Sequence, residues 1–227
     1  MKKALLIIIL ICSLYANLFP KMGLYLGFTS LFGLSGSTTT ANKIFPEEFR
    51  NFDTGFTFNI GLKHSLNNIL GYSVLLDLGY YHDSYEFKYE TQEYNSRIVE
   101  SYQFENFLVG LLTRFHLSFF SIGVGGGAKI PTMGYYSKEG LTERNRYFLS
   151  YGDMNDIFDH VVIPYLKLTL DFSILNYLLL GAYVNYDFPI SIKPNNYLSE
   201  NMINKSPMSG LDIGIQFGYF ISFYKNN

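Results

Sequence analysis

The sequence predicts an all-β protein in which eight antiparallel strands close into a transmembrane barrel. Three features of the 227-residue chain lead to this prediction. Segments with alternating apolar and polar residues recur along its whole length, the connections between them alternate between short and long, and one face of nearly every segment is apolar. Strands that cross a bilayer need about 9–11 residues, which is close to the length of these segments.

The N-terminal stretch MKKALLIIILICSLYAN has the pattern of a secretory signal peptide. Lys2 and Lys3 precede an apolar run that is too short to span a bilayer, which requires about 20 residues. We expect residues 1–16 to be a signal peptide cleaved after Ala16, and residues 17–227 to form the outer-membrane β-barrel domain. Lipidation of Cys12 is the alternative, and the bulky Ile11 before it disfavours that reading.

Eight segments follow with a period of two residues, and Gly recurs inside nearly all of them, which argues against helices. The chain is also rich in aromatic residues, with 20 Tyr and 21 Phe. The predicted strands are 23–32, 55–63, 71–81, 104–115, 119–130, 162–172, 177–188 and 210–223.

The connections favour a barrel threaded through a membrane over a soluble one. Strands 2–3, 4–5 and 6–7 are joined by the short turns HSLNNIL, HLS and SILN, whereas the other connections have roughly 20–30 residues. Outer-membrane barrels combine tight periplasmic turns with long external loops in this way. A lipocalin-like soluble carrier has the same strand count but gives no reason for this regular alternation.

The polar face of the strands is expected to point into the lumen, since the apolar face must meet lipid. Eight strands leave an interior just wide enough for side chains to fill it, so these charges should pair. A narrow channel is the alternative, because inward glycines would leave space. The predicted lumen charge network consists of Lys63, Asp77, Arg114, Lys129, Lys167, Asp171, Asp187 and Asp212.

The last segment, QFGYFISF, carries a polar–x–Gly–x–x–apolar–x–aromatic pattern at Gln216, Gly218, Ile221 and Phe223. This pattern resembles the C-terminal signal by which outer-membrane barrels are recognised by their assembly machinery. The whole mature chain resembles the small eight-stranded outer-membrane barrels of the OmpA/OmpX/OmpW-like group. The resemblance implies localisation in the cell outer membrane, with membrane lipid and the assembly machinery as partners.

The function that the sequence favours is a structural or interaction role, adhesin-like or antigen-like, in which surface-exposed loops contact an external protein or host ligand. The loops contain many Tyr residues among adaptable polar ones, a composition that supports protein contact. The alternative is a small pore for apolar or small polar solutes. We expect a monomer that is not an enzyme.

Several classes of partner and cofactor are disfavoured by the composition. The formal charge of −2 gives no basic footprint for nucleic acid. The histidines His64, His116 and His160 lack the spacing of metal ligands, so neither a metal site nor a cofactor is predicted.

A lipid A-modifying esterase is a minor alternative, carried by the segment YHDSYEF. His82 and Ser84 share the lipid-facing parity, as does Glu105 on the next strand, about one diagonal pair away. A base, a hydroxyl and a carboxylate in reach of one another could hydrolyse an ester. The three residues resemble the His-x-Ser and Glu site of the outer-membrane lipid A deacylases, although Tyr85 stands where those enzymes usually have asparagine.

Overall fold

The structure, a computed structural model, describes residues 22–38, 46, 48–67, 69–91, 96–139, 144–174, 177–193 and 207–223. The expected signal peptide lies outside the described residues. The elements within them are β1 (Met22–Thr38), β2 (Asn51–Ser65), β3 (Leu70–Thr91), β4 (Ser96–Leu117), β5 (Phe120–Glu139), β6 (Arg144–Ser150), α2 (Tyr151–Ile157), β7 (Ile163–Ile174), β8 (Leu178–Ile190) and β9 (Met208–Phe223).

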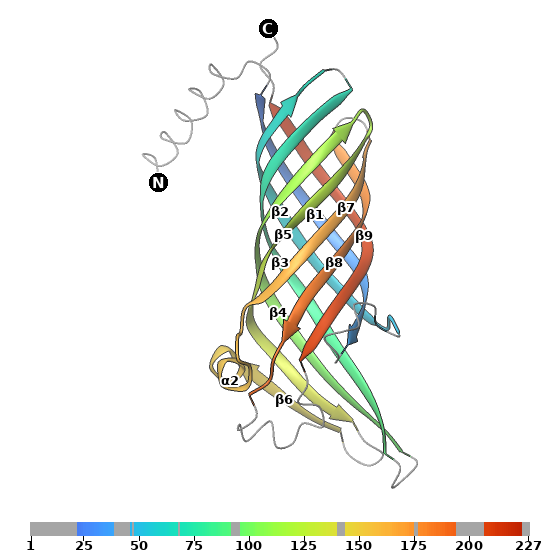
Figure 1. The fold of residues 1–227 in the computed structure, drawn as a ribbon, viewed down its shortest axis with the longest axis vertical. Helices are drawn as coiled ribbons and strands as arrows, with labels where there is room; N and C mark the ends of the chain where they lie inside the picture. The colour runs from blue at the N-terminus through green and yellow to red at the C-terminus, as the bar shows by residue number, and fades with distance from the viewer. Residues whose placement is uncertain are drawn as a thin grey trace.

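Eight of these strands close into a ring in which every pairing is antiparallel (Figure 1). β1 pairs with β2 on one side and with the C-terminal strand β9 on the other, where Leu24 lies opposite Phe223. The pairing of β4 with β5, and of β5 with β7, completes the ring. Closure leaves no strand edge within the ring, as a bilayer requires, because an open edge in hydrocarbon leaves backbone groups unsatisfied. The predicted fold class is therefore confirmed.

The strands β3 and β4 are longer than the sequence predicted. Residues 82–91 and 96–103 were expected in a loop, but they extend the β3–β4 hairpin well beyond the other strands (Figure 1). The pairing runs without a slip from Leu70 opposite Leu117 to Thr91 opposite Ser96. The alternation continues here with polar residues on the outward face. An extension beyond the lipid no longer needs an apolar outward face, so its composition resembles that of a loop.

The segment expected as the longest loop, residues 131–160, also contains regular structure. β5 continues to Glu139 and pairs with β6, which lies beyond the end of β7. A register shift between Glu105 and Asn106 places a bulge at Thr132, beside Pro131. A bulge accommodates proline because that residue cannot donate a ladder hydrogen bond. The short helix α2 follows and begins with a capping box formed by Ser150 and Asp153.

The two ends of the barrel differ in their connections. At one end, which we call the short-turn end, β2 joins β3 and β4 joins β5 through tight turns. The Asn67 side chain accepts hydrogen bonds from the amides of Ile69 and Leu70, and Ser118 has a positive φ of 56°. The opposite end carries the long hairpins and α2, and we call it the hairpin end (Figure 1). In outer-membrane barrels the short turns face the periplasm, so the hairpin end faces outward.

The outer surface of the ring is a continuous apolar band. Large side chains such as Phe56, Leu111, Leu168 and Phe217 are about half exposed on it. The residues between them along each strand point inward and are buried, as the pleat dictates. No helix among the described residues is long and apolar enough to cross a bilayer.

The hairpin end of the lumen is filled by an apolar cluster. Met154 and Ile157 of α2, together with Phe158, pack against ring residues that include Tyr102 and Phe104. The space beside several inward glycines of the described lumen is occupied by neighbouring side chains. A Cβ atom at Gly33 or Gly214 would collide with the side chain of Tyr183.

Candidate active site and lumen charges

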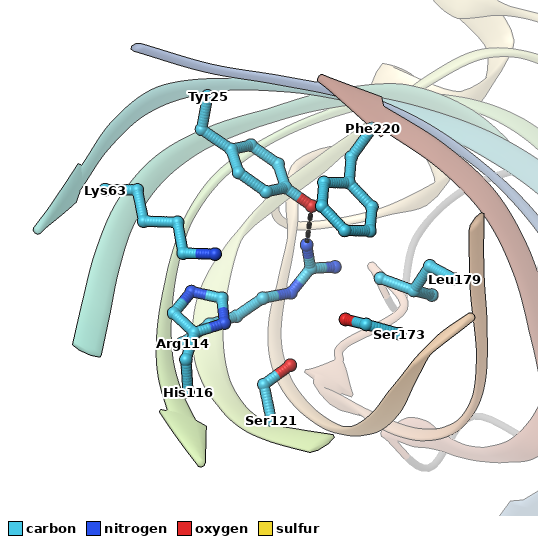
Figure 2. A pocket seen from close by; sticks show the side chains of 8 residues that line it. All are labelled: Tyr25, Lys63, Arg114, His116, Ser121, Ser173, Leu179 and Phe220. Carbon is cyan, nitrogen blue, oxygen red and sulfur yellow. Dashed lines mark hydrogen bonds between the residues drawn. The ribbon is translucent and has the colours of Figure 1, made fainter. Parts of the chain in front are cut away.

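The lumen contains the predicted charges in three groups along the barrel axis. At the short-turn end, Arg114 on β4 lies with its Nε 3.1 Å from Asp171 Oδ2 on β7. The Arg114 Nη1 also donates to the Tyr25 hydroxyl at 2.9 Å (Figure 2). Asp171 accepts further hydrogen bonds from Thr169 and Gln216. Both members of this ion pair are almost fully buried.

A small cavity borders this ion pair at the short-turn end. Its volume of about 10 Å³ is room for about one water molecule. Figure 2 shows Lys63, His116 and Ser121 around it, with Arg114 projecting between them toward Tyr25. The cavity is too small for a substrate.

The middle of the lumen holds a second buried pair. The Lys167 Nζ on β7 donates to Asp77 Oδ2 on β3 at 3.0 Å. The other carboxylate oxygen, Asp77 Oδ1, accepts from the Asn59 amide at 2.6 Å. This carboxylate therefore has a partner on each side.

The third group lies toward the hairpin end and centres on Lys129. Its Nζ lies 2.9 Å from Asp187 and 3.7 Å from Asp212, and both belong to the predicted lumen charge network. Its shortest contact is to Asp83, at 2.7 Å, and that residue was missed. Continuing the alternation of β3 past Tyr81 would have found Asp83 on the inward face.

The four residues of the predicted assembly signal lie on β9, two on the inward face and two on the outward face. Gln216 points inward and hydrogen-bonds Asp171, whereas Ile221 and Phe223 are exposed on the outer surface. Gly218 lies opposite Thr29 of β1. Recognition by the assembly machinery stays a prediction.

The three residues of the esterase hypothesis meet on the outer wall of the barrel. The His82 Nδ1 lies 2.8 Å from Glu105 Oε1, and its Nε2 lies 3.3 Å from the Ser84 hydroxyl oxygen. With Nδ1 donating to the carboxylate, Nε2 is free to accept the serine proton. The arrangement is that of a nucleophile, a base and an orienting acid.

The strand register explains why these side chains converge. Side chains at positions i and i+2 of a strand share a face, so the imidazole of His82 can reach Ser84 along β3. Glu105 lies directly opposite His82 across the β3–β4 ladder, rather than one diagonal pair away as the sequence suggested. Directly opposed residues have Cβ atoms about 5 Å apart, close enough for an imidazole and a carboxylate to hydrogen-bond.

Further hydrogen bonds fix the members of this triad. The Tyr80 hydroxyl donates to Glu105 Oε2 at 2.7 Å, so both carboxylate oxygens are engaged. The carbonyl oxygen of Ser84 accepts from the Asn51 amide at 3.2 Å and from the Ser35 hydroxyl at 3.4 Å. The alternation of the sequence carries no signal for the contact from Tyr80 or for those from β1 and β2.

The triad lies where the apolar band meets the polar extension. Phe107, two residues from Glu105 and exposed on the same face, marks the apolar side. On the polar side, Gln103 lies opposite Ser84 and accepts a hydrogen bond from Arg146, which stacks over Tyr135. The side chains of His82 and Glu105 keep 27% and 21% exposure, whereas Ser84 beside them is 8% exposed, so the imidazole and the carboxylate form the outer surface of the site. A molecule with an apolar part and a polar part fits this border.

No protein-family model and no curated protein sequence matches the chain, but solved barrel structures do. One is Ail, the attachment invasion locus protein of Yersinia pestis, in complex with the heparin analogue sucrose octasulfate. It is 12% identical, with 88% of this chain and 97% of that one covered, at a TM-score of 0.30. Another is the N-terminal β-barrel domain of Pseudomonas aeruginosa OprF, at 9% identity, coverages of 88% and 99%, and a TM-score of 0.36. The outer membrane protein OprG of the same species is 12% identical, with coverages of 91% and 98% and a TM-score of 0.28.

The chain is an eight-stranded outer-membrane β-barrel. This statement rests on the closed ladder and the apolar outer band of the structure itself. The low identities and TM-scores add nothing about what the barrel does. The functional assignment must therefore come from the side chains of this chain.

Proposed function

We propose that the protein is an ester hydrolase that acts on acyl chains of lipids in the outer leaflet. The observation that carries this proposal is the chain of contacts from Ser84 through His82 to Glu105 on the lipid-facing wall. A salt bridge alone would explain the contact between His82 and Glu105. It would not explain why the second imidazole nitrogen faces a serine hydroxyl.

The proposed reaction proceeds through an acyl-enzyme. The Ser84 oxygen attacks the ester carbonyl carbon while His82 Nε2 takes the serine proton, and the tetrahedral intermediate then expels the lipid alcohol, which receives that proton. Water, deprotonated by the same nitrogen, then attacks the acyl carbon. The bond from that carbon to the Ser84 oxygen breaks, the imidazole returns the proton to Ser84, and the fatty acid leaves. Glu105 and Tyr80 hold the imidazole in the tautomer that this sequence of steps needs.

The amide of Gln103 is the donor that we assign to the developing oxyanion. It lies opposite Ser84 in the ladder, and its Oε1 accepts from Arg146, which orients the NH₂ group. Loss of one such donor typically lowers kcat by about 10²–10³-fold. Gln103→Ala should lower kcat by that factor with little change in KM.

The position of the site suggests the substrate class. A lipid in the outer leaflet places its ester groups between the acyl chains and the head group, which is the level at which the apolar band ends. The resemblance of His82, Ser84 and Glu105 to the lipid A deacylase site makes lipid A the first substrate to test, with phospholipid as the second.

The test uses the purified barrel refolded in detergent and mixed with lipopolysaccharide or phospholipid, with mass spectrometry of the lipid products. The wild-type protein should release one acyl chain, and a fluorophosphonate probe should label Ser84. Ser84→Ala and His82→Ala should each reduce turnover at least about 10³-fold. The matched control is Ser101→Ala, because Ser101 is a part-buried hydroxyl on β4 that bonds Ser137 instead of a histidine. Absence of both acyl release and probe labelling in a correctly folded wild-type barrel would refute the proposal.

A surface-interaction role is a second candidate, favoured by the projecting β3–β4 and β5–β6 hairpins. Tyr147, Phe148 and Tyr151 are exposed there beyond the ring, and exposed aromatic residues are common in binding surfaces. Binding of the barrel to host-cell or matrix preparations should then disappear in the triple variant Tyr147→Ser, Phe148→Ser, Tyr151→Ser. Equal binding by that variant would exclude this surface.

A further inference from the structure

Three carboxylates from distant parts of the chain gather inside the barrel toward its hairpin end. They belong to Asp53 of β2, Asp83 of β3 and Asp212 of β9, and one oxygen of each lies within 4.8 Å of the others. All three side chains are buried, with residue exposures of 1–2%. The esterase proposal uses none of them.

The charges around this cluster do not balance. Asp187 is a fourth buried carboxylate here, and Lys129 is the only cation that forms an ion pair with any of the four among the described residues. One positive charge therefore faces four negative ones. Removing an uncompensated ion from water costs several kcal/mol even after relaxation, so this group needs further positive charge or protons.

Asp53 is the member that lacks a partner. Its carboxylate oxygens form no hydrogen bond of standard geometry, and Ser35 and Ser84 are the polar residues close enough to interact with them weakly. Asp212 Oδ2 also makes no hydrogen bond, and Lys129 lies 3.7 Å from it. The neighbouring Asn185, directly opposite Asp212 in the ladder and 1% exposed, leaves both amide atoms without a partner. Buried polar groups are normally satisfied, so several unpaired ones at this level of the lumen are available to bind water or an ion.

We propose that Asp53, Asp83 and Asp212 bind one divalent cation, with Ca²⁺ as the best fit. Carboxylate oxygens are hard ligands that suit Ca²⁺ and Mg²⁺. Calcium ligands lie 2.3–2.6 Å from the ion, so two oxygens of one site are at most about 5 Å apart, a limit that the cluster meets. Mg²⁺ demands a near-ideal octahedron and keeps several waters, which this crowded interior disfavours.

Binding would tie together three strands at the level of the proposed active site. Asp83 lies between His82 and Ser84 in β3, with its side chain on the opposite face of the wall. A cation that links it to β2 and β9 therefore holds the back of that wall in place. The cation site does not depend on the esterase proposal, and its test needs no enzyme activity.

The experiment uses the full barrel refolded in detergent with CaCl₂, with MgCl₂, or with EDTA. The chain has 20 Tyr and no Trp, so tyrosine-sensitised terbium luminescence can report binding directly. We expect Tb³⁺ luminescence that Ca²⁺ displaces, and an unfolding midpoint that rises with the logarithm of the Ca²⁺ concentration. Asp53→Asn should weaken Tb³⁺ binding at least tenfold and remove the Ca²⁺ dependence of the midpoint. Asp153→Asn, which changes an aspartate on α2 outside the lumen, is the matched control and should leave both unchanged.

Three outcomes would overturn the proposal. The first is an unfolding midpoint that is identical in Ca²⁺ and in EDTA but changes with pH. That result would mean that protons, and not a cation, neutralise the buried carboxylates. The second is terbium binding that Asp53→Asn and Asp153→Asn affect equally. The third is terbium binding that persists in both lumen variants, Asp53→Asn and Asp212→Asn. If Asp53→Asn does not refold, Asp212→Asn replaces it under the same criteria.

Discussion

The buried ion pair between Arg114 and Asp171 offers the sharpest test of the closed lumen. In the structure the guanidinium contacts the carboxylate at 3.1 Å and the Tyr25 hydroxyl at 2.9 Å, and both charged side chains are at most 2% exposed. Arg114→Ala leaves Asp171 with only the neutral donors Thr169 and Gln216. Removal of one partner from a buried pair costs about 3–5 kcal/mol, because the remaining charge stays out of water.

The assay is urea unfolding of the refolded barrel, followed by tyrosine fluorescence and by gel mobility. With a denaturant slope of about 2 kcal/mol/M, a loss of about 4 kcal/mol lowers the midpoint by about 2 M. The double change Arg114→Met with Asp171→Asn should recover most of this loss, because neither charge then remains and the amide can still meet Gln216. Arg146→Ala, at an exposed arginine, is the control and should stay within about 0.5 kcal/mol of wild type. An unchanged midpoint for Arg114→Ala would mean that water reaches Asp171, and the closed-lumen reasoning would fail.

Three further outcomes are expected. The double variant Ile221→Ala, Phe223→Ala should insert more slowly in cells, as quantified by heat-modifiable gel migration. Phe217→Ala is the control and should insert normally, because Phe217 is similarly exposed on the same strand but lies outside the signal. Equal levels of folded barrel in the double variant and the control would contradict a terminal signal. In planar bilayers the barrel should be silent, because side chains fill the described lumen, and stable conductance steps would restore the pore hypothesis. Hydrogen bonds from Ser150 hold the pKa of Asp153 below its ordinary value. The stability that the ionised Asp153 adds to α2 is therefore complete above about pH 4 and is lost as the pH falls further. Hydrogen exchange of the α2 amides should accordingly become faster on acidification. It should also become faster in Ser150→Ala, which is expected to lower the local stability of α2 by about 1 kcal/mol.

Much of the ring could be predicted because a single physical rule governs it. A strand between lipid and a packed lumen must alternate apolar and polar side chains. This period of two residues therefore identified all eight ring strands and the inward orientation of Arg114, Lys167 and Asp187. The rule weakens where the strand leaves the lipid. Residues 82–91 still alternate, but with His, Ser and Glu on the outward face, and this composition is the same as that of a loop.

The candidate site could be predicted only in part, because parity gives the face of a side chain but not its neighbour. The hypothesis placed His82, Ser84 and Glu105 on one face, whereas their hydrogen bonding depends on the register in which β3 pairs with β4. Asp53 and Asp83 were missed for a related reason. The strand before Asp83 was expected to end at residue 81 and the strand after Asp53 to begin at residue 55, so neither residue was assigned to a face.

The filled lumen favours a functional site outside it. Among the described residues the lumen charges are paired and Met154, Ile157 and Phe158 pack at its hairpin end, so we expect chemistry or binding on the wall or on the hairpins. A rigid interior also suits a site on the wall, because catalytic side chains act only when their supporting residues hold them within about 0.5 Å of the productive geometry. Here the support comes from Tyr80 behind Glu105, and from Asn51 and Ser35 at the Ser84 carbonyl. The bonds to the Ser84 carbonyl would form with any residue at this position, because a buried backbone oxygen needs a partner. The bond from Tyr80 to Glu105 supports a triad side chain directly, and together with the contacts of His82 it is why we rank hydrolysis above adhesion for this barrel.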